Sequence, residues 1–304
     1  MPEWPDLHVL AGAFNERLPG LTIAGAKVFN PIVLRIPVEG ALEELVAGKV
    51  LGSTDHRGKY LLFHLNGGST GPDDPAWTGA QLPVWSDTQP PDPAGAQLVV
   101  NPMLAGTFQY CPAGEKKPPR TCLAIHLDNG YDLRYIDEKQ MGKVYYLPEP
   151  GYIRIIPGFA GLGPEANLAA VSAGEFVKKV RARHSDIRNL LTDQEFLAGI
   201  GNAYADEILF CARIHPKRPA HSLSTEEADR VYRTIKELFA EAEVEIKSHL
   251  AKDLRGKVRH FFKVRGREGE LCPVCGTKIV RRTHGLNEMN FCPGCQPAPA
   301  GHLY

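Results

Sequence analysis

Residues 190–202 read LLTDQEFLAGIGN and are the most strongly patterned stretch in the second half of the chain. Gly199 and Gly201 permit a tight backbone turn there, because glycine adopts conformations that other residues avoid. Asn202 is a good N-cap for a helix over 203–213, since its side chain can accept a backbone N–H of the first turn. Backbone N–H groups in such a turn can also bind a phosphate. Taken alone, the same spacing is also typical of an ordinary corner between two helices.

Helical periodicity surrounds this loop on both sides. Apolar residues recur at helical spacing over 173–182, 185–192, 202–213 and 224–248. The last segment has Ser224 or Thr225 as its N-cap and Glu227 shortly after it, which is close to a capping box. The change in character follows the sequence PEPG at 148–151, so we predict a helical domain over 151–257.

The N-terminal part reads as β-rich, and we predict one domain over 1–150. Short runs of strand-forming residues occur at 21–23, 32–36, 60–65, 97–101 and 122–127, and strand signals continue to about residue 146. Helical spacing over 7–18 predicts one helix near the N-terminus. Residues 67–95 are rich in Gly, Pro, Ser and Asp, and we interpret them as a surface insertion between strands.

Four of the seven cysteines form two C-x-x-C pairs that are separated by sixteen residues. Four thiolates at this spacing suit a closed, tetrahedral structural Zn²⁺ site; disulfides are the alternative, which a cytosolic chain disfavours. We therefore predict a zinc-finger module over 258–304, with room for one hairpin between ligands Cys272, Cys275, Cys292 and Cys295. The remaining three are interpreted as small buried apolar residues: Cys111, Cys122 and Cys211.

The chain has 35 Lys+Arg and 35 Asp+Glu, and this zero net charge argues against a nucleic-acid partner only if the charges are evenly mixed. They are not. Residues 247–267 carry eight basic residues against the single Asp253, and further basic clusters lie at 178–188 and 278–282. Such patches are typical of proteins that bind a phosphate backbone, although a solvated basic helix face is the alternative.

Length and composition indicate a globular protein of about two domains, since 43% of its 304 residues are hydrophobic and 23% are charged. No run of about 18 apolar residues occurs, and the first ten residues lack the pattern of a signal peptide. We therefore expect a cytoplasmic protein without a membrane partner.

Five motifs, taken together, resemble the formamidopyrimidine-DNA glycosylase / endonuclease VIII family of base-excision repair enzymes, in the family's order and over nearly the whole chain. The resemblance implies an α+β fold: an N-terminal β-sandwich with a flanking helix, then a helix–two-turn–helix domain with a zinc finger. The motifs are Met1-Pro2-Glu3-x-Pro5-Asp6, Arg57-Gly58-Lys59-Tyr60-Leu61, Gly161-Leu162-Gly163-Pro164-Glu165, Gly199-Ile200-Gly201-Asn202-x-Tyr204-Ala205-x-Glu207 with Ile214-His215-Pro216, and Val264-x-Gly266-Arg267-x-Gly269.

The resemblance implies a bifunctional DNA glycosylase and abasic-site (AP) lyase that acts through an N-terminal proline. Removal of Met1 leaves Pro2 with a free secondary amine, and an α-amino group titrates at about 7.7–8.0, so a useful fraction is nucleophilic near neutral pH. Attack on C1′ of the damaged nucleotide expels the base and forms an iminium, which acidifies the C2′ protons for strand cleavage. Glu3 would shuttle protons to the sugar, and Lys59 would contact phosphate or sugar.

The implied partner is double-stranded DNA that contains a lesion or an abasic site, bound by a monomer with one structural Zn²⁺. Apolar wedges of suitable size would fill the gap left by an everted base. By resemblance the DNA-binding residues are Asn202 for phosphate, Leu104 and Met141 as wedges, and Lys139, Arg267 and Arg281.

The sequence departs from the family's pattern in three places. Asn287 stands where the zinc hairpin usually presents an arginine, and Lys139 with Gln140 replaces a guanidinium-bearing segment. The stretch 246–263 lacks the Gly/Thr-rich loop that in some relatives caps 8-oxoguanine. Oxidised pyrimidines, ring-opened purines and abasic sites all remain open as substrates.

Two other functions are compatible with parts of the sequence. On the same scaffold, the protein could be a non-catalytic or structure-selective DNA-binding protein, which retention of Met1 would favour because it blocks the Pro2 amine. Alternatively, the four cysteines could belong to a zinc-ribbon component of an RNA or ribosomal assembly, with the Pro2-Glu3 start accidental.

Overall fold

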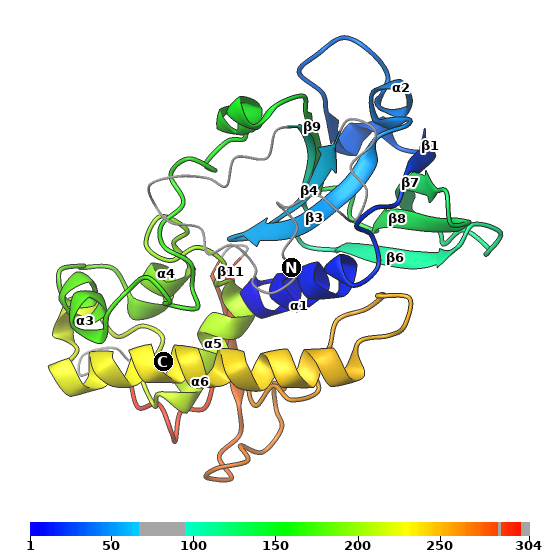
Figure 1. Ribbon diagram of the computed structural model, residues 1–304. Helices are drawn as coiled ribbons and strands as arrows, with labels where there is room; N and C mark the ends of the chain where they lie inside the picture. The colour runs from blue at the N-terminus through cyan, green and yellow to red at the C-terminus, as the bar shows by residue number, and fades with distance from the viewer. Residues whose placement is uncertain (67–94, 285–286, 299–304) are drawn as a thin grey trace. The chain divides into compact units, whose positions relative to one another are not determined.

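The computed structural model describes residues 1–66, 95–284 and 287–298 (Figure 1). Most of the interpreted insertion at 67–95 therefore lies outside the described residues. The chain divides into two compact units, one of residues 1–160 with 246–257 and one of 161–245 with 258–304. The stretch 246–257, which the sequence analysis grouped with the helices, belongs to the first unit, and the cysteine module belongs to the same unit as the helices.

The first unit contains two sheets, and its described strands are antiparallel except for the parallel pair β2–β9. The first sheet has the order β1 (Ile23–Val28), β7 (Thr121–Leu127), β8 (Tyr131–Asp137), β6 (Gly106–Pro112). The second has the order β2 (Leu34–Arg35), β9 (Lys143–Leu147), β5 (Ala96–Asn101), β4 (Tyr60–Asn66), β3 (Val50–Arg57). Apolar side chains from both sheets form one shared core, so the predicted β-sandwich is confirmed.

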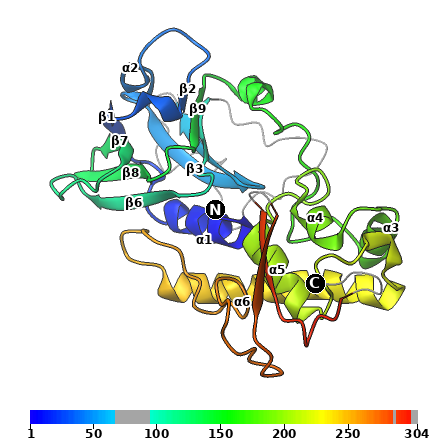
Figure 2. The ribbon, with the colours of Figure 1, turned by 180° about the vertical axis from the view of Figure 1, so that it is seen from behind.

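Helix α1 (Trp4–Asn15) is the flanking helix of this unit and packs against β3 and β4. Figure 2 shows it below β6 and β3. The ring of Phe14 contacts Phe63 from one sheet and Phe108 from the other. At its C-terminal end, the Asn15 side chain exchanges two hydrogen bonds with the backbone of Thr54 on β3. The helix begins three residues before the predicted start at Leu7, because Pro5 is pre-set for the first turn of a helix.

The shorter elements of the first unit are α2 (Leu42–Val46) and 3₁₀ turns at Pro31–Val33 and Pro150–Ile155. The predicted strand over 32–36 forms only the two-residue β2. The Asn30 side chain accepts the Ile32 N–H, which, with Pro31, starts a 3₁₀ turn in place of extended chain.

The second unit contains the four predicted helices, α3 (Ala173–Arg181), α4 (Ile187–Thr192), α5 (Asn202–Cys211) and α6 (Thr225–His249), with a 3₁₀ turn at Ala220–Ser222. The last residues of α6 belong to the first unit. The capping box of α6 is confirmed, since the backbone N–H of Ser224 donates to Glu227 and that of Glu227 donates to the Ser224 hydroxyl.

The predicted N-cap role of Asn202 is wrong. Gly201 is the N-cap of α5 and has extended backbone angles, so Asn202 is already the first helical residue. The predicted hairpin between the cysteine pairs is confirmed as β10 (Val280–His284) and β11 (Asn287–Phe291). None of the helices in the described parts of the chain combines the length and apolar character that a membrane crossing requires.

Candidate active site

Pro2 and Glu3 immediately precede the first turn of α1, and both are buried. Glu3 is only 2% exposed, and its backbone N–H donates to the Asp6 carboxylate at 2.8 Å. This bond satisfies one of the backbone donors that every helix start leaves without an intrahelical partner. A carboxylate so deeply buried is costly unless a positive charge or hydrogen bonds compensate it.

Lys59 supplies a positive charge close to Glu3. It lies in the two-residue turn between β3 and β4, where Arg57 pairs with Tyr60 and Gly58 adopts a positive φ of 55°. Burial lowers the pKa of the Lys59 ammonium from its ordinary value, and the negative charge of Glu3 opposes this effect. Two predicted site residues that are more than fifty positions apart in the chain therefore come within electrostatic range.

Leu104 and Met141 lie on two turns at one end of the first sheet, and their side chains are 48% and 42% exposed. Asp137 organises the second turn, because its carboxylate accepts the backbone N–H groups of Lys139 and Gly142. The Lys139 side chain is exposed on this turn. On the first turn, the Lys257 ammonium donates to the Leu104 carbonyl at 3.0 Å.

The two turns converge on the hydroxyl of Tyr135. The start of β6 pairs with the end of β8, at Gly106 and Asp137. A Cβ atom would lie 2.4 Å from the Tyr135 oxygen at Gly106 and 1.8 Å from it at Gly142. Both turns therefore need glycine for close approach, and both present an exposed apolar side chain at the same end of the sheet.

In the second unit, Gln194 holds the loop between α4 and α5. Its side-chain amide donates to the carbonyls of Thr192 and Ile200, and its side-chain oxygen accepts the Gly199 N–H. The loop therefore has a fixed shape in front of Asn202, and Gly199 adopts a φ of 108°. Sequence reasoning missed the role of Gln194. The only signal for it in the sequence was its position between the two predicted helices.

Two adjacent carboxylates on α5, those of Asp206 and Glu207, are buried and fix the chain around them. Asp206 accepts hydrogen bonds from Arg188, Arg265 and the backbone of Asn290 on β11. Glu207 accepts the three consecutive backbone N–H groups of residues 263–265. Burial raises the pKa of both carboxyls, and these partners oppose the shift.

Not all the predicted basic clusters are available to a partner. Arg188 is 5% exposed and is paired with Asp206, so its inclusion among the phosphate-binding residues of 178–188 is wrong. Arg267 and Arg281 keep exposed side chains, although each forms an ion pair, with Glu270 and Glu268 respectively. These two residues remain predictions.

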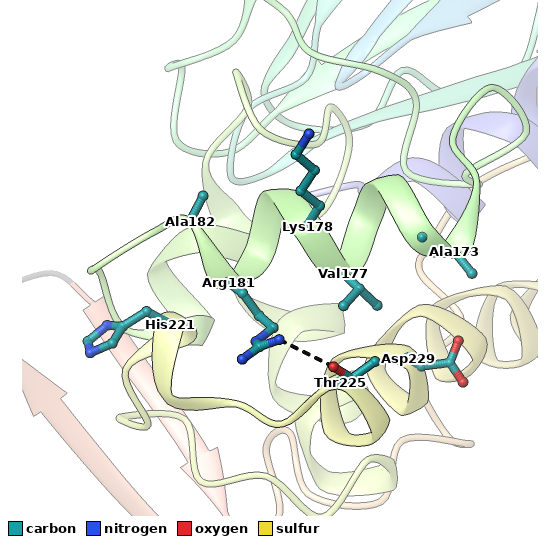
Figure 3. A pocket seen from close by; sticks show the side chains of 9 residues that line it. Ala173, Val177, Lys178, Arg181, Ala182, His221, Thr225 and Asp229 are labelled. Carbon is teal, nitrogen blue, oxygen red and sulfur yellow. Dashed lines mark hydrogen bonds between the residues drawn. The ribbon is translucent and has the colours of Figure 1, made fainter.

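The exposed part of the 178–188 cluster borders an open groove between α3 and the start of α6 (Figure 3). Arg181 points from α3 toward Thr225 and donates to its hydroxyl at 3.2 Å. Lys178 also lines this groove, and Asp229 on α6 brings a negative charge to it. The groove is therefore of mixed charge.

The four cysteines of the two C-x-x-C pairs lie together, with their sulfur atoms within 4.8 Å of one another. The Cys275 and Cys292 sulfurs are 3.4 Å apart, and those of Cys272 and Cys295 are 3.8 Å apart. A tetrahedral site with Zn–S bonds of about 2.3 Å requires sulfur separations of roughly 3.8 Å. The cluster therefore fits a tetrahedral metal ion. Of the other cysteines, Cys111 and Cys122 are buried as predicted, and Cys211 is partly exposed.

The chain matches two family models over most of its length. One, described as the formamidopyrimidine-DNA glycosylase N-terminal domain, matches residues 1–144, and the other, the H2TH (helix–two-turn–helix) domain of the same glycosylase, matches residues 162–252. The formamidopyrimidine-DNA glycosylase of Pelotomaculum thermopropionicum is 34% identical over 97% of this chain and 99% of its own. The enzyme of the same name from Thermus thermophilus is 32% identical over 97% of this chain and 98% of its own.

Solved structures agree with these matches. The crystal structure of the MutM (Fpg) protein from Thermus thermophilus has a TM-score of 0.76 at 30% identity, covering 98% of this chain and 100% of that one. A Lactococcus lactis Fpg complex with abasic-site DNA has a TM-score of 0.79 at 22% identity, covering 97% and 100%, and is similar in fold.

Fold and site thus define a DNA-repair protein with a β-sandwich unit and a helix–two-turn–helix unit. The chain belongs to the formamidopyrimidine-DNA glycosylase (Fpg/MutM) family and is an Fpg-like DNA glycosylase of base-excision repair.

Proposed function

We propose that this protein excises oxidised or ring-opened bases from double-stranded DNA and then cleaves the strand as an AP lyase, with the amine of Pro2 as the nucleophile. The observation that carries the proposal is the buried carboxylate of Glu3, next to Pro2 in the chain, within electrostatic range of the Lys59 ammonium. The amine becomes free when Met1 is removed.

The reaction begins when the lone pair of the Pro2 nitrogen attacks C1′ and the bond from C1′ to the base breaks. The base leaves with a proton, and opening of the sugar ring gives an iminium between Pro2 and C1′. The iminium accepts the electron pair from the C2′–H bond, and the 3′ phosphate leaves by β-elimination. A second elimination releases the 5′ phosphate, and hydrolysis of the iminium regenerates the amine.

Glu3 and Lys59 have different tasks in this scheme. The Glu3 carboxyl delivers a proton to the ring oxygen as the sugar opens, and its negative charge then stabilises the iminium. Lys59 is the natural contact for a phosphate oxygen at the lesion, because its ammonium is held in the two-residue turn between β3 and β4.

Borohydride trapping on DNA with one abasic site tests the nucleophile. The protein with Met1 removed, verified by mass spectrometry, should form a covalent adduct. Pro2→Gly, or a form that retains Met1, should lose it. If no adduct forms on an abasic site or on any of several lesions, the protein is instead a non-catalytic, structure-selective DNA-binding protein.

Glu3→Gln separates proton transfer from DNA binding. This variant should lose base excision by roughly 10²-fold or more, the usual scale of general acid–base catalysis, while its DNA affinity stays nearly constant. An equal loss of both would contradict the proton-transfer role.

DNA binding is proposed to use both units, with the protein acting as a monomer on nucleoid DNA. Leu104 and Met141 are exposed apolar wedges that can enter the stack where a base is everted, and Lys139 lies beside Met141. Asn202 presents the first backbone donors of α5 to a phosphate. A Lactococcus lactis protein of the same fold was crystallised with abasic-site DNA, which agrees with this substrate class.

The four-cysteine cluster is proposed to hold one structural Zn²⁺, which would fix the β10–β11 hairpin. Metal analysis should give one equivalent of zinc per chain, and Cys292→Ser should lose it. Cys211→Ser is the matched control, since Cys211 lies outside the cluster. Well under one equivalent in the parent protein would refute the site.

A further inference from the structure

Three rings connect the N-terminal segment to the strand that leads to Lys59. Trp4 stacks on His8 one helical turn later, with ring centroids 4.7 Å apart and an interplanar angle of 12°. His56 on β3 meets both rings edge-on, at 5.2 Å from Trp4 and 5.3 Å from His8. The His8 Nδ1 and His56 Nε2 atoms are 3.1 Å apart and share one hydrogen bond.

This cluster adjoins both halves of the proposed active site along the chain. Trp4 directly follows Glu3, and His56 is three residues before Lys59, at the end of β3. The bond between His8 and His56 therefore ties the helix that follows Pro2-Glu3 to the strand that precedes Lys59. It is a direct polar link between α1 and the end of β3, whereas the Asn15–Thr54 bonds join the opposite end of α1.

The proton positions in the pair follow from the surroundings of His56. Its Nδ1 is shielded from solvent and has no hydrogen-bond partner among the residues that the structure describes. A buried N–H without an acceptor is costlier than a buried lone pair, so we place the hydrogen of His56 on Nε2. His56 then donates and the His8 Nδ1 accepts, which requires both rings to be neutral.

The charges around the pair favour this neutral state. Burial lowers the pKa of His56 to about 3, and the positive charge of Arg57, like any positive charge on His8, acts in the same direction. Burial also lowers the pKa of His8. If His8 were protonated, its Nδ1 would become a donor, and His56 would have to move its hydrogen to the unpartnered Nδ1.

We propose that the neutral His8–His56 pair, clamped by Trp4, is a positioning device that holds the Pro2–Glu3 segment in register with Lys59 for attack on the sugar. The inference rests on the proposed function, because it assigns the pair a task in the Pro2 reaction. His8 and His56 do not act on the substrate themselves. Their effect is on the geometry of imine formation and not on DNA affinity.

Trp4 fluorescence tests the pair without any need for activity. Trp77→Phe together with Trp85→Phe leaves Trp4 as the only tryptophan of the chain. A protonated imidazole quenches an indole stacked on it, so emission should fall on acidification, with a midpoint below the ordinary histidine value of about 6.5. His8→Gln should abolish this titration. A midpoint at or above that value would overturn the neutral pair, whereas constant emission throughout the pH range of the folded protein would support it.

The functional arm compares two substitutions at the same position. The Gln side chain of His56→Gln keeps an N–H donor near the position of the imidazole Nε2, whereas His56→Leu removes it. At saturating abasic-site DNA, His56→Leu should slow borohydride trapping by about tenfold or more, the scale expected from misplaced reacting groups, and leave the DNA dissociation constant nearly unchanged. His56→Gln should recover most of the rate.

The outcomes separate this inference from the proposed function. Loss of trapping in Pro2→Gly together with an unchanged rate in His56→Leu would leave the lyase intact and overturn the positioning role. Equal rates in the Gln and Leu variants, or a parallel loss of DNA affinity, would also overturn it. If the parent protein forms no Pro2-dependent adduct, the proposed function fails and the positioning role fails with it.

Discussion

At the residue scale, the glycines of the two exposed apolar turns matter because of the side chain that they lack. Gly106 and Gly142 let two backbone segments close on the Tyr135 hydroxyl, and Leu104 and Met141 are presented as a result. Sequence reasoning assigned roles to Leu104 and Met141 but none to the glycines that follow them, Gly106 and Gly142.

Gly142→Ala should disturb the turn that carries Met141. Its Cβ would lie 1.8 Å from the Tyr135 oxygen and 3.0 Å from the Asp137 carboxylate, so the turn must move. We expect a loss of about 1–3 kcal/mol in the free energy of unfolding, the usual cost of overpacking, measured by urea denaturation. Gly114→Ala is the control, since a Cβ there meets nothing within 4 Å. Equal stability of the two variants would contradict the close approach.

His56 should make the protein sensitive to mild acid. Its pKa of about 3 in the folded state lies below the ordinary value of 6.5, so the unfolded chain binds more protons at intermediate pH. The free energy of unfolding therefore falls as pH drops below 6.5, and the contribution of His56 between about pH 7 and about pH 5.5 is on the order of 1 kcal/mol. Urea unfolding at the two pH values measures this loss.

Two variants identify the source of that pH dependence. His56→Gln should remove this part of the loss because its side chain does not titrate. His184→Gln, a change at an exposed histidine, should leave the loss unchanged. If the His56→Gln protein showed the parent's pH dependence, the buried neutral imidazole would be ruled out.

At the element scale, α5 is the organising helix of the second unit. Its periodicity was evident in the sequence, and the hairpin between the cysteine pairs was equally predictable from spacing. The partners of Asp206 and Glu207 were not, because Arg188, Arg265 and Asn290 are distant in sequence and meet them only in the folded chain. A charged residue inside an apolar helix face was the one available signal.

Asp206→Asn should be strongly destabilising. It removes the counter-charge of the buried Arg188 guanidinium and one of the two carboxylates that pair with Arg265, which keeps Glu288. Breaking a buried ion pair by removing one partner typically costs about 3–5 kcal/mol. Asp229→Asn is the matched control, because its ion pair with Arg233 is exposed and worth about 1 kcal/mol or less. Thermal and urea unfolding compare the two, and similar losses would contradict the role of the network.

At the scale of the whole molecule, the equal numbers of acidic and basic residues hide the fact that the basic residues serve two different purposes. Part of the positive charge, including Arg188 and Arg265, neutralises buried carboxylates within the second unit. Only the basic side chains that stay exposed, such as those of Lys139 and Arg281, are available to a phosphate backbone. We therefore expect modest DNA affinity that depends strongly on salt.

Arg281→Gln should weaken binding to all DNA sequences alike. Loss of one phosphate contact reduces the slope of log affinity against log salt concentration by about 1. Fluorescence anisotropy over a salt series measures this slope. Lys116→Gln, which removes an exposed charge from the turn between β6 and β7, should leave the slope unchanged. An unaltered slope in Arg281→Gln would show that its pair with Glu268 is structural only.

The sequence by itself determined the features that depend on neighbours along the chain. Helix periodicity, the Ser224 capping box, the spacing of the cysteines and the joint set of motifs were all visible there, because each is set by local backbone geometry or by ligand spacing. One local prediction was nevertheless wrong. The N-cap of α5 is Gly201, whose backbone is extended, and Asn202 is already helical.

Tertiary structure alone decided which distant groups meet. It brought Glu3 close to Lys59, joined His8 to His56, closed both apolar turns on Tyr135 and buried Arg188 against Asp206. The physical reason is that burial and pairing change the free-energy cost of a charged or polar group and the chemistry that it can perform. Those quantities depend on the neighbours that folding supplies, which the order of residues does not reveal.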